Sequence, residues 1–383
     1  MPVKGSSKPR GKRISVGPSG PPAKVKKIVT EPQKISIEHR YTHGPGVVLT
    51  FGQGDVGQLG LGPDVMEKPR PALIPDLDDI IDICAGGMHT ICLTSKGKVL
   101  TFGCNDEGVL GRDTSIEGTE TVPGEVKLEC VAMQISAGDS HSAALLEDGR
   151  VFAWGSFRDS HGAMGLSPNG VQKLPMLMPI DQQIVKIASG ADHLVMLTAD
   201  GHIFTCGCAE QGQLGRVSER GANGGSRQGV SQLLIPAQVN FKRSYKLEFH
   251  NIWAGSYCTF AREKNGGNIY VFGLNNYNQL GIDNSKTHFH PVLAKSFSNR
   301  TWQEICGGQH HVLALDSNGT VYSLGRKEYG RLGLGENCSD AVQPTVIPKL
   351  ENIKCINIAC GSSVSFAVTE DGKVYSWGMG TNG

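Results

Sequence analysis

A chain of 383 residues has ample material for a core, and its 51 glycines are far above the ~7% of ordinary proteins. This glycine content excludes a mainly helical protein, because each glycine inside a helix costs about 1 kcal/mol relative to alanine. The net charge of +1 hides an asymmetry, since residues 1–40 hold ten Lys or Arg and two Glu, a net of +8, which leaves −7 on the rest of the chain.

The first 43 residues are rich in Pro, Gly, Ser and Lys and are too polar to fold alone, so we predict a disordered basic tail followed by one domain at 44–383. Two basic clusters in the tail have the spacing of a bipartite nuclear-localisation signal: Lys12 and Arg13, then Lys24, Lys26 and Lys27. They predict recognition by a nuclear import receptor. The same side chains would contact DNA phosphates without reading sequence, which makes DNA binding strongly dependent on salt.

A unit of about 52 residues recurs along residues 44–383. In each copy a short apolar segment ends in glycine, and these glycines are Gly52, Gly103, Gly155, Gly207, Gly273, Gly325 and Gly378. A second motif, Ala/Ser/Cys-Gly-x-x-His with its variants, has its glycine at Gly86, Gly138, Gly190, Gly255, Gly307 and Gly361. Chance cannot hold one period over seven copies, so the sequence predicts a repeat architecture.

Each unit is predicted to be a set of short antiparallel strands. Apolar positions alternate, as in Val151 to Trp154, and pairs such as Asp148-Gly149 precede these segments, which favours hairpins with type I′ turns. Seven such units predict an all-β, seven-bladed β-propeller. A β-solenoid is the alternative, although its repeats are usually shorter. Because the second motif occurs only six times, we expect the last blade to be incomplete and to leave an unpaired strand edge.

Several segments carry a family resemblance. FGQGDVGQLGLG (51–62), SAGDSHSAAL (136–145), WGSFRDSHG (154–162) and GGQHHVLALDSNG (307–319) resemble the regulator-of-chromosome-condensation family over roughly residues 44–383. The resemblance implies a nuclear, chromatin-associated protein that acts as a guanine-nucleotide exchange factor for the small GTPase Ran. Such a factor accelerates nucleotide release without making or breaking bonds, so we expect no enzyme chemistry and no cofactor.

The second motif separates structural positions from variable ones. Its histidines (His89, His141, His193 and His310) recur at one place and are expected to be structural. Only two of the variable positions before these histidines carry a carboxylate, at Asp139 and Asp192. A third aspartate, Asp55, lies in the first Gly-Gln-Leu-Gly turn. Each aspartate is consistent with a turn that bonds its own backbone. The alternative is an acidic surface for a basic partner, and the resemblance favours it.

The resemblance adds three residues to this GTPase-binding face. One residue is inserted at His310-His311, so one of the two histidines is displaced, and the resemblance places His311 on the face. Arg216 and Asn276 match further contact positions of the family.

The third copy contains WGSFRDSHGAMG (154–165) where other copies have a plain turn. Phe157, Arg158, Asp159 and Ser160 are predicted to form a protruding hairpin with an apolar tip and charged flanks. A longer turn without function is the alternative. In the family, the corresponding element is a wedge that presses against the GTPase near its nucleotide.

A second insertion of about fourteen residues falls near 216–245, and it contains several arginines among Gly, Ser and Asn. A solvated loop explains it, but loops on a rigid scaffold often carry binding, and arginine forks suit carboxylate clusters. The resemblance implies that Arg220 or Arg227 reaches the acidic patch of the histones on a nucleosome.

The remaining sequence features exclude several classes. Eleven cysteines form no zinc-site spacing, which predicts free thiols, no metal and a reducing compartment. No apolar run approaches the ~20 residues of a membrane span and no signal-peptide core is found, so we expect no membrane association. No catalytic triad or phosphate-binding loop is present. A non-catalytic interaction scaffold of the same repeat superfamily is the competing function, and a secreted propeller inhibitor is a third.

Overall fold

The structure, a computed structural model, describes residues 36–40, 43–223, 229–241, 247–298 and 300–380. The predictions for Lys12, Arg13, Lys24, Lys26, Lys27 and Arg227 lie outside these residues. Among the described residues, no helix is long and apolar enough to cross a membrane. The described part is almost entirely β-structure.

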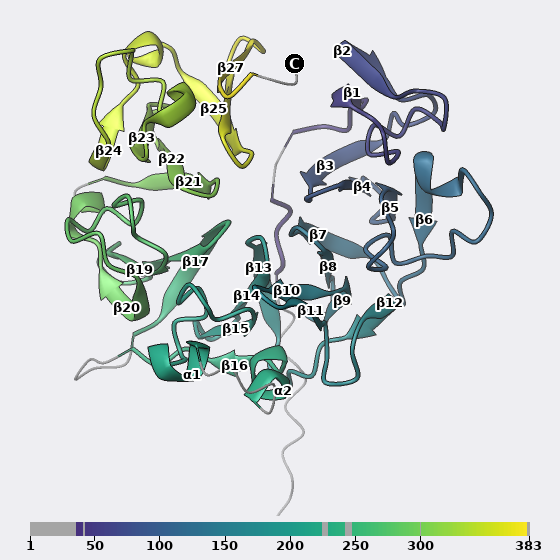
Figure 1. Cartoon of the computed structure of the whole chain (residues 1–383), viewed down its shortest axis with the longest axis horizontal. Coiled ribbons are helices and arrows are strands. Elements are labelled where there is room, and N and C mark those ends of the chain that lie inside the picture. The colour runs from purple at the N-terminus through teal and green to yellow at the C-terminus, as the bar shows by residue number, and fades with distance from the viewer. Residues whose placement is uncertain (1–35, 41–42, 224–228, 242–246, 299, 381–383) are drawn as a thin grey trace, which may run out of the picture. The chain divides into compact units, whose positions relative to one another are not determined.

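Antiparallel sheets follow one another along the chain and lie around a common centre in Figure 1. The first blade has β1 (Leu49–Gln53) and β2 (Glu67–Leu73). The second has β3 (Ile80–Ala85), β4 (His89–Thr94), β5 (Val99–Gly103) and β6 (Gly124–Val126). The third has β7 (Ala132–Ala137), β8 (His141–Leu146), β9 (Val151–Gly155) and β12 (Gln172–Leu177).

The later blades repeat this order from the centre outward. The fourth has β13 (Ile184–Ser189), β14 (His193–Thr198), β15 (Ile203–Gly207) and β16 (Ala237–Gln238). The fifth has β17 (Phe249–Gly255), β18 (Cys258–Glu263), β19 (Ile269–Gly273) and β20 (His288–Leu293). The sixth has β21 (Trp302–Gly307), β22 (His311–Asp316), β23 (Val321–Gly325) and β24 (Ala341–Val346). The seventh has β25 (Cys355–Cys360), β26 (Val364–Thr369) and β27 (Val374–Gly378). The predicted seven-bladed propeller is therefore confirmed.

A few other elements lie outside the sheets. Two short strands, β10 (Phe157–Asp159) and β11 (Gly162–Gly165), form a separate hairpin. Two short helices, α1 (Glu219–Asn223) and α2 (Val230–Leu234), lie in the second insertion. Single 3₁₀ turns cover Thr119–Thr121, Lys295–Phe297, Glu328–Gly330 and Pro348–Leu350.

The tight turns between the second and third strands explain part of the glycine content. The Gly149 N–H bonds the Leu146 carbonyl, and the Leu146 N–H bonds the Arg150 carbonyl. Only the glycine of the Asp148-Gly149 pair has a positive φ, of 85°. A type I′ turn needs positive φ at both central residues, so the turn is instead a type I turn followed by a left-handed glycine. The hairpin prediction is right, and the predicted turn type is wrong.

The core lies between neighbouring sheets. Trp154 of β9 and Trp302 of β21 are both fully buried, and Trp154 packs with Ile91 and Leu93 of the preceding blade. The two end blades are not joined, because β1–β2 and β25–β27 remain separate sheets. Apolar side chains at these edges are exposed, with Phe51 at 52% and Val374 at 66%. This agrees with the expected unpaired edge.

Residues 36–40, which we name the strap, lie against the blades although the sequence placed them in the tail. Ile37 is buried among residues of the third and fourth blades. The Glu38 carbonyl accepts a hydrogen bond from Gln134 Nε2 at 2.8 Å. Arg40 makes an ion pair with Glu304 of β21 at 3.2 Å. Burial of one isoleucine and these polar contacts explain why the ordered domain begins before residue 44.

Candidate functional site

Four equivalent histidines each link their own blade to the next one. Their Nε2 atoms lie 2.9–3.0 Å from a hydroxyl of the following blade, in the pairs His89–Ser142, His141–Ser189, His193–Thr259 and His311–Ser365. Burial lowers the pKa of His89 to about 4 and that of His193 to about 3, so these rings are neutral at physiological pH. The motif requires glycine because a Cβ at Gly138 would lie 2.1 Å from Cε1 of His141. The structural role predicted for His89, His141 and His193 is confirmed.

At His310-His311, the prediction placed the wrong histidine, His311, on the GTPase-binding face. His311 is fully buried and pairs in register with Gly325, as His141 pairs with Gly155. Gly308 donates its N–H to the His311 carbonyl, as Gly138 does to that of His141, and the strand register agrees from Trp302 and Ala132 onward. Gly308 is therefore the motif glycine of this blade, and the predicted insertion is wrong. His310 occupies the second variable position of the motif, as Asp192 does in the fourth blade. It lies half-buried in the variable turn, with its ring 5.2 Å from that of Tyr277.

The variable turns of neighbouring blades form one surface, which we name the turn face. It contains residues 87–88, 139–140, 191–192, 256–257 and 309–310. Backbone hydrogen bonds join successive turns, including Asp139 N–H to the Ala191 carbonyl at 2.7 Å and Ala191 N–H to the Ser256 carbonyl at 2.9 Å. Asp139, Asp192 and His310 belong to these turns, so the structure brings them to the same side of the propeller.

The turns that follow the third strands lie on the same side. The Cys208 N–H, directly after β15, donates to the Asp192 carbonyl at 2.7 Å. Antiparallel pairing therefore places both kinds of turn at one end of the blade. Asp55 and Asn276 are exposed and equivalent. Each accepts a hydrogen bond from the glutamine three residues later, Gln58 at 2.9 Å and Gln279 at 3.0 Å. Both residues are thus held at the edge of the turn face.

Asp192 has a strongly perturbed carboxyl group. Burial raises its pKa to about 7, and the nearby Asp139 adds to the rise. The backbone N–H of Arg158, 2.8 Å from Oδ1, opposes it. Burial also raises the pKa of Asp139. Because each of these two carboxyl groups ionises with difficulty on its own, a cationic group that stabilises their ionised forms is favoured beside them.

Asp192→Asn is expected to stabilise the protein at alkaline pH. The raised pKa means that the folded state holds the Asp192 proton more tightly than the unfolded state, so this residue's contribution to stability falls as the pH rises toward about 7. Asparagine keeps the acceptor for the Arg158 N–H and never ionises. Urea unfolding should show the largest gain above pH 7 and almost none near pH 4. An equal gain at both pH values would contradict the titration of Asp192.

Arg216 makes its hydrogen bonds within its own blade. Its guanidinium donates to the carbonyls of Thr205, Gln232, Leu233 and Ile235 at 3.2–3.3 Å. Arg112 uses the equivalent position in the second blade in the same way, bonding the carbonyls of Thr101, Thr119 and Val122. The Arg216 side chain therefore holds α2 against β15, and the GTPase contact that the resemblance implies stays a prediction.

The predicted hairpin is present, but its apolar residue points inward. Phe157 is fully buried, with its ring 4.7 Å from that of His141, and it packs in the core with Leu194. The expected apolar tip is therefore wrong. Burying a phenylalanine is worth about 2–3 kcal/mol, so Phe157 anchors the hairpin rather than exposing it.

Polar contacts tie the rest of the hairpin to the blades on either side. Arg158 makes an ion pair with Glu107 of the second blade at 2.7 Å, and the Ser160 N–H bonds Glu210 of the fourth blade at 3.1 Å. Asp159, His161 and Glu210 have ligand atoms within 4.8 Å of one another, close enough to share a metal ion. The Glu210 carboxylate already accepts hydrogen bonds from the backbone N–H and the hydroxyl of Ser160. These hydrogen bonds explain the position of Glu210 without a metal ion.

The second insertion forms α1 and α2 instead of an irregular loop. Arg220 lies exposed in α1. One of the two arginines predicted for histone binding is thus at the surface, and the other, Arg227, lies outside the described residues.

A ring of polar residues on the inner strands was missed by sequence reasoning. The fourth residue before each motif glycine, which is Gly308 in the sixth blade, is polar, at Asp82, Gln134, Lys186, Asn251, Glu304 and Asn357. Four of these line a central cavity of about 830 Å³. Burial raises the pKa of Asp82 to about 6 and lowers that of Lys186 to about 8. The signal was present in the sequence, as a recurring polar position within apolar strands.

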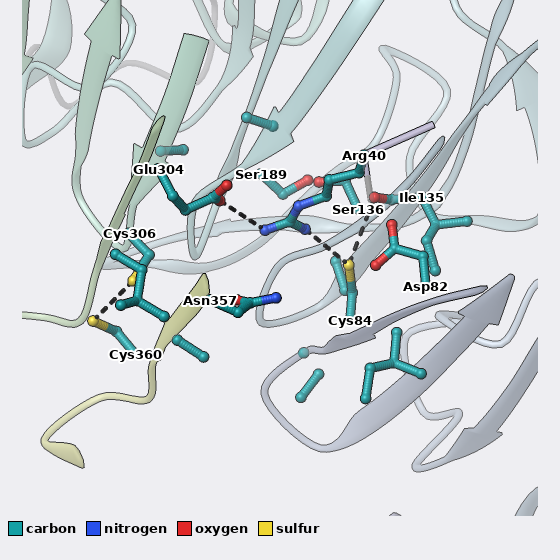
Figure 2. Close-up of a pocket in the computed structure, with 18 of the residues that line it drawn as sticks. Arg40, Asp82, Cys84, Ile135, Ser136, Ser189, Glu304, Cys306, Asn357 and Cys360 are labelled. Carbon is teal, nitrogen blue, oxygen red and sulfur yellow. Dashed lines mark hydrogen bonds and ion pairs between the residues drawn. The ribbon is translucent and has the colours of Figure 1, made fainter. Parts of the chain in front are cut away.

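Figure 2 shows how the strap enters this cavity. Arg40 extends between Glu304 and Cys84, with Nη1 3.5 Å from the Cys84 sulfur. Because Glu304 belongs to the sixth blade and Cys84 to the second, one side chain from the strap contacts both sides of the cavity.

Comparison with known proteins agrees with this geometry. The family model of the RCC1-like domain matches residues 47–383. The chain belongs to the RCC1-like family. This RCC1-like chain is 52% identical to the human protein called Regulator of chromosome condensation, covering 94% of this chain and 86% of that protein. It is 30% identical to the Saccharomyces cerevisiae protein called Guanine nucleotide exchange factor SRM1, covering 90% and 81% respectively.

Solved structures show the same architecture. The crystal structure of Prp20p from Saccharomyces cerevisiae, described with its binding to Gsp1p and histones, is similar to this RCC1-like chain with a TM-score of 0.79 at 29% identity. It covers 90% of this chain and 83% of that one. A second structure, of yeast RCC1 (Prp20) bound to Kap60, gives a TM-score of 0.78 at 30% identity, with 92% and 86% covered.

Proposed function

We propose that this protein is a guanine-nucleotide exchange factor for a Ran-type small GTPase, with the turn face as its docking surface. The observation that carries the proposal is the link between Asp192 and the hairpin, since Asp192 holds the Arg158 N–H while facing Asp139. Family membership and the exchange-factor and Gsp1p descriptions of its relatives support it.

The mechanism needs no bond chemistry. Asp139, Asp192, Asp55, Asn276 and His310 would bind a basic surface of the GTPase. The hairpin of Arg158, Asp159 and Ser160 would press beside the nucleotide and its magnesium ion. A factor that binds the nucleotide-free GTPase more tightly than the loaded form lowers nucleotide affinity by the same factor. Electrostatic attraction of the acidic face would also speed encounter.

Chromatin docking would use other parts of the chain. The exposed Arg220 and, outside the described residues, Arg227 suit the acidic patch of a nucleosome. The basic clusters from Lys12 to Lys27 suit DNA phosphates and a nuclear import receptor. The histone description of Prp20p supports histones as partners and a chromatin-associated, nuclear location, and the Kap60 description of yeast RCC1 supports an import receptor.

Asp192→Ala is expected to slow release of a fluorescent guanine nucleotide from Ran about tenfold, which corresponds to a loss of about 1.4 kcal/mol. The reason is that the substitution removes a charge from the docking surface and the acceptor that holds the hairpin. Release is measured by stopped flow with excess exchange factor.

Asp200→Ala is the matched control. Asp200 lies in the turn after β14, at the other end of the strand that follows Asp192, and its removal should leave the rate unchanged. An unchanged rate for Asp192→Ala would remove this residue from the mechanism. If the unmodified protein accelerates release from no member of a small-GTPase panel, the interaction-scaffold alternative is correct.

A further inference from the structure

Two cysteines face each other across neighbouring inner strands. Cys306 ends the apolar part of β21 and Cys360 ends β25, and their sulfur atoms lie 3.3 Å apart. Both are half-buried and line the central cavity, so small solutes in the cavity can reach them. Figure 2 shows the pair at one end of the cavity, apart from Cys84 and Arg40.

The surroundings make Cys360 the more nucleophilic of the two. Burial opposes its ionisation, but the Cys306 thiol and His311 stabilise the thiolate and lower its pKa. The pKa of Cys306 is raised in turn, because its proton is shared with Cys360. Cys84, in the same cavity, is different, since burial raises its pKa to about 12. A thiolate next to a second thiol is the arrangement that reacts with peroxide and then closes to a disulfide.

We propose that Cys306 and Cys360 are a peroxide-reactive modification site that closes to an intrachain disulfide between the sixth and seventh blades. The Cys360 thiolate attacks one oxygen of hydrogen peroxide and breaks the O–O bond, which gives a sulfenic acid and a hydroxide that takes up a proton as water. The Cys306 sulfur then attacks the Cys360 sulfur, the S–O bond breaks, and a second water leaves. Two thiols lose two electrons and two protons, and the peroxide is reduced to two waters.

The structure requires little movement for this step. A disulfide has an S–S length of about 2.05 Å, so the sulfurs must approach by about 1.3 Å from their separation of 3.3 Å. The two strands belong to neighbouring blades that His311 and Ser365 already join at 2.9 Å. The new bond would link residues far apart in sequence, which restricts the unfolded chain and raises stability.

The repeats supply conservative variants. By register, Cys306 is equivalent to Ser136 of β7, since they pair with Leu313 and Ala143, and Cys360 is equivalent to Ala137. Cys306→Ser and Cys360→Ala therefore introduce residues that the same fold already accepts at these positions. Cys84→Ser, which removes the other cavity thiol near Arg40, is the matched control.

The test treats the folded full-length protein with about one equivalent of hydrogen peroxide, blocks the remaining thiols by alkylation and maps non-reduced peptides by mass spectrometry. We expect one cross-linked pair, containing Cys306 and Cys360, that disappears with a reductant. It should persist in Cys84→Ser and be absent from Cys306→Ser and Cys360→Ala. The urea midpoint should rise on oxidation only in proteins that form the cross-link.

Several outcomes would overturn the proposal. In one, peroxide leaves Cys306 and Cys360 as open to alkylation as the other cysteines. In another, Cys360 forms a disulfide with a different partner in the unmodified protein. Should the variants fail to fold, the peptide map of the unmodified protein still decides, because it compares this pair with the nine other cysteines of the same chain.

Discussion

His311→Ala is expected to destabilise the propeller by about 3 kcal/mol. The substitution removes a fully buried ring, opens a cavity beside Gly308 and removes the imidazole that bonds the Ser365 hydroxyl, which keeps only its hydrogen bond to the Arg331 carbonyl. The lost contact lies between the sixth and seventh blades, so the loss should appear as a lower urea midpoint. Nucleotide release by the protein that remains folded should be close to normal.

His310→Ala separates the two roles. His310 is half-buried in the turn face and makes a ring contact with Tyr277, so its removal should change stability by less than about 1 kcal/mol. It should slow nucleotide release if the turn face docks the GTPase. The reverse pattern, with stability lost in His310→Ala and exchange lost in a stable His311→Ala protein, would show that the roles of the two histidines had been assigned wrongly.

Phe157→Ala is expected to cost about 3–5 kcal/mol and to detach the hairpin from the blades. Phe157 is fully buried against His141 and within the core between the third and fourth blades, and truncation of a buried phenylalanine has this magnitude. Because the Arg158 N–H is adjacent, its bond to Asp192 should be lost as well. Exchange should therefore fall even at temperatures where the propeller stays folded.

The control for this prediction is Arg158→Ala. It removes an ion pair between partly exposed side chains and keeps the anchor, so unfolding should shift by less than about 1 kcal/mol. Urea unfolding and limited proteolysis at 156–165 measure the two effects. A Phe157→Ala protein with unchanged stability would mean that the hairpin is held by its polar contacts alone.

The fold was accessible from the sequence because each repeat must satisfy the same local constraints. Gly138 recurs with His141 because the imidazole packs on the glycine, and Gly149 recurs because the hairpin needs a left-handed residue. Such constraints act within about ten residues and are copied in every blade. The common location of Asp139 and Asp192 then follows because both lie in the two-residue turn between the motif glycine and histidine, on neighbouring blades.

The errors have a different origin, because they depend on contacts between distant residues. The carbonyls that occupy Arg216 come from an insertion that forms α2, and the sequence indicated only a polar loop there. Phe157 looked like an exposed tip because the space between His141 and Leu194 that receives it is made by two blades. In the sixth blade, the adjacent pairs Gly307-Gly308 and His310-His311 allow two alignments of the motif, and only the strand register assigns the structural role to His311.

The polar ring on the inner strands gives each blade a different partner. Seven similar units risk docking in the wrong order during folding, a failure known for repeat proteins. Lys186 bonds Asn251 of the next blade, Gln134 bonds the Val185 carbonyl, and Glu304 receives Arg40 from the strap. The first two pairings exist only when those blades are neighbours, and the third fixes the sixth blade relative to the strap. The centre of the molecule thus encodes the order of blades whose apolar faces are nearly interchangeable.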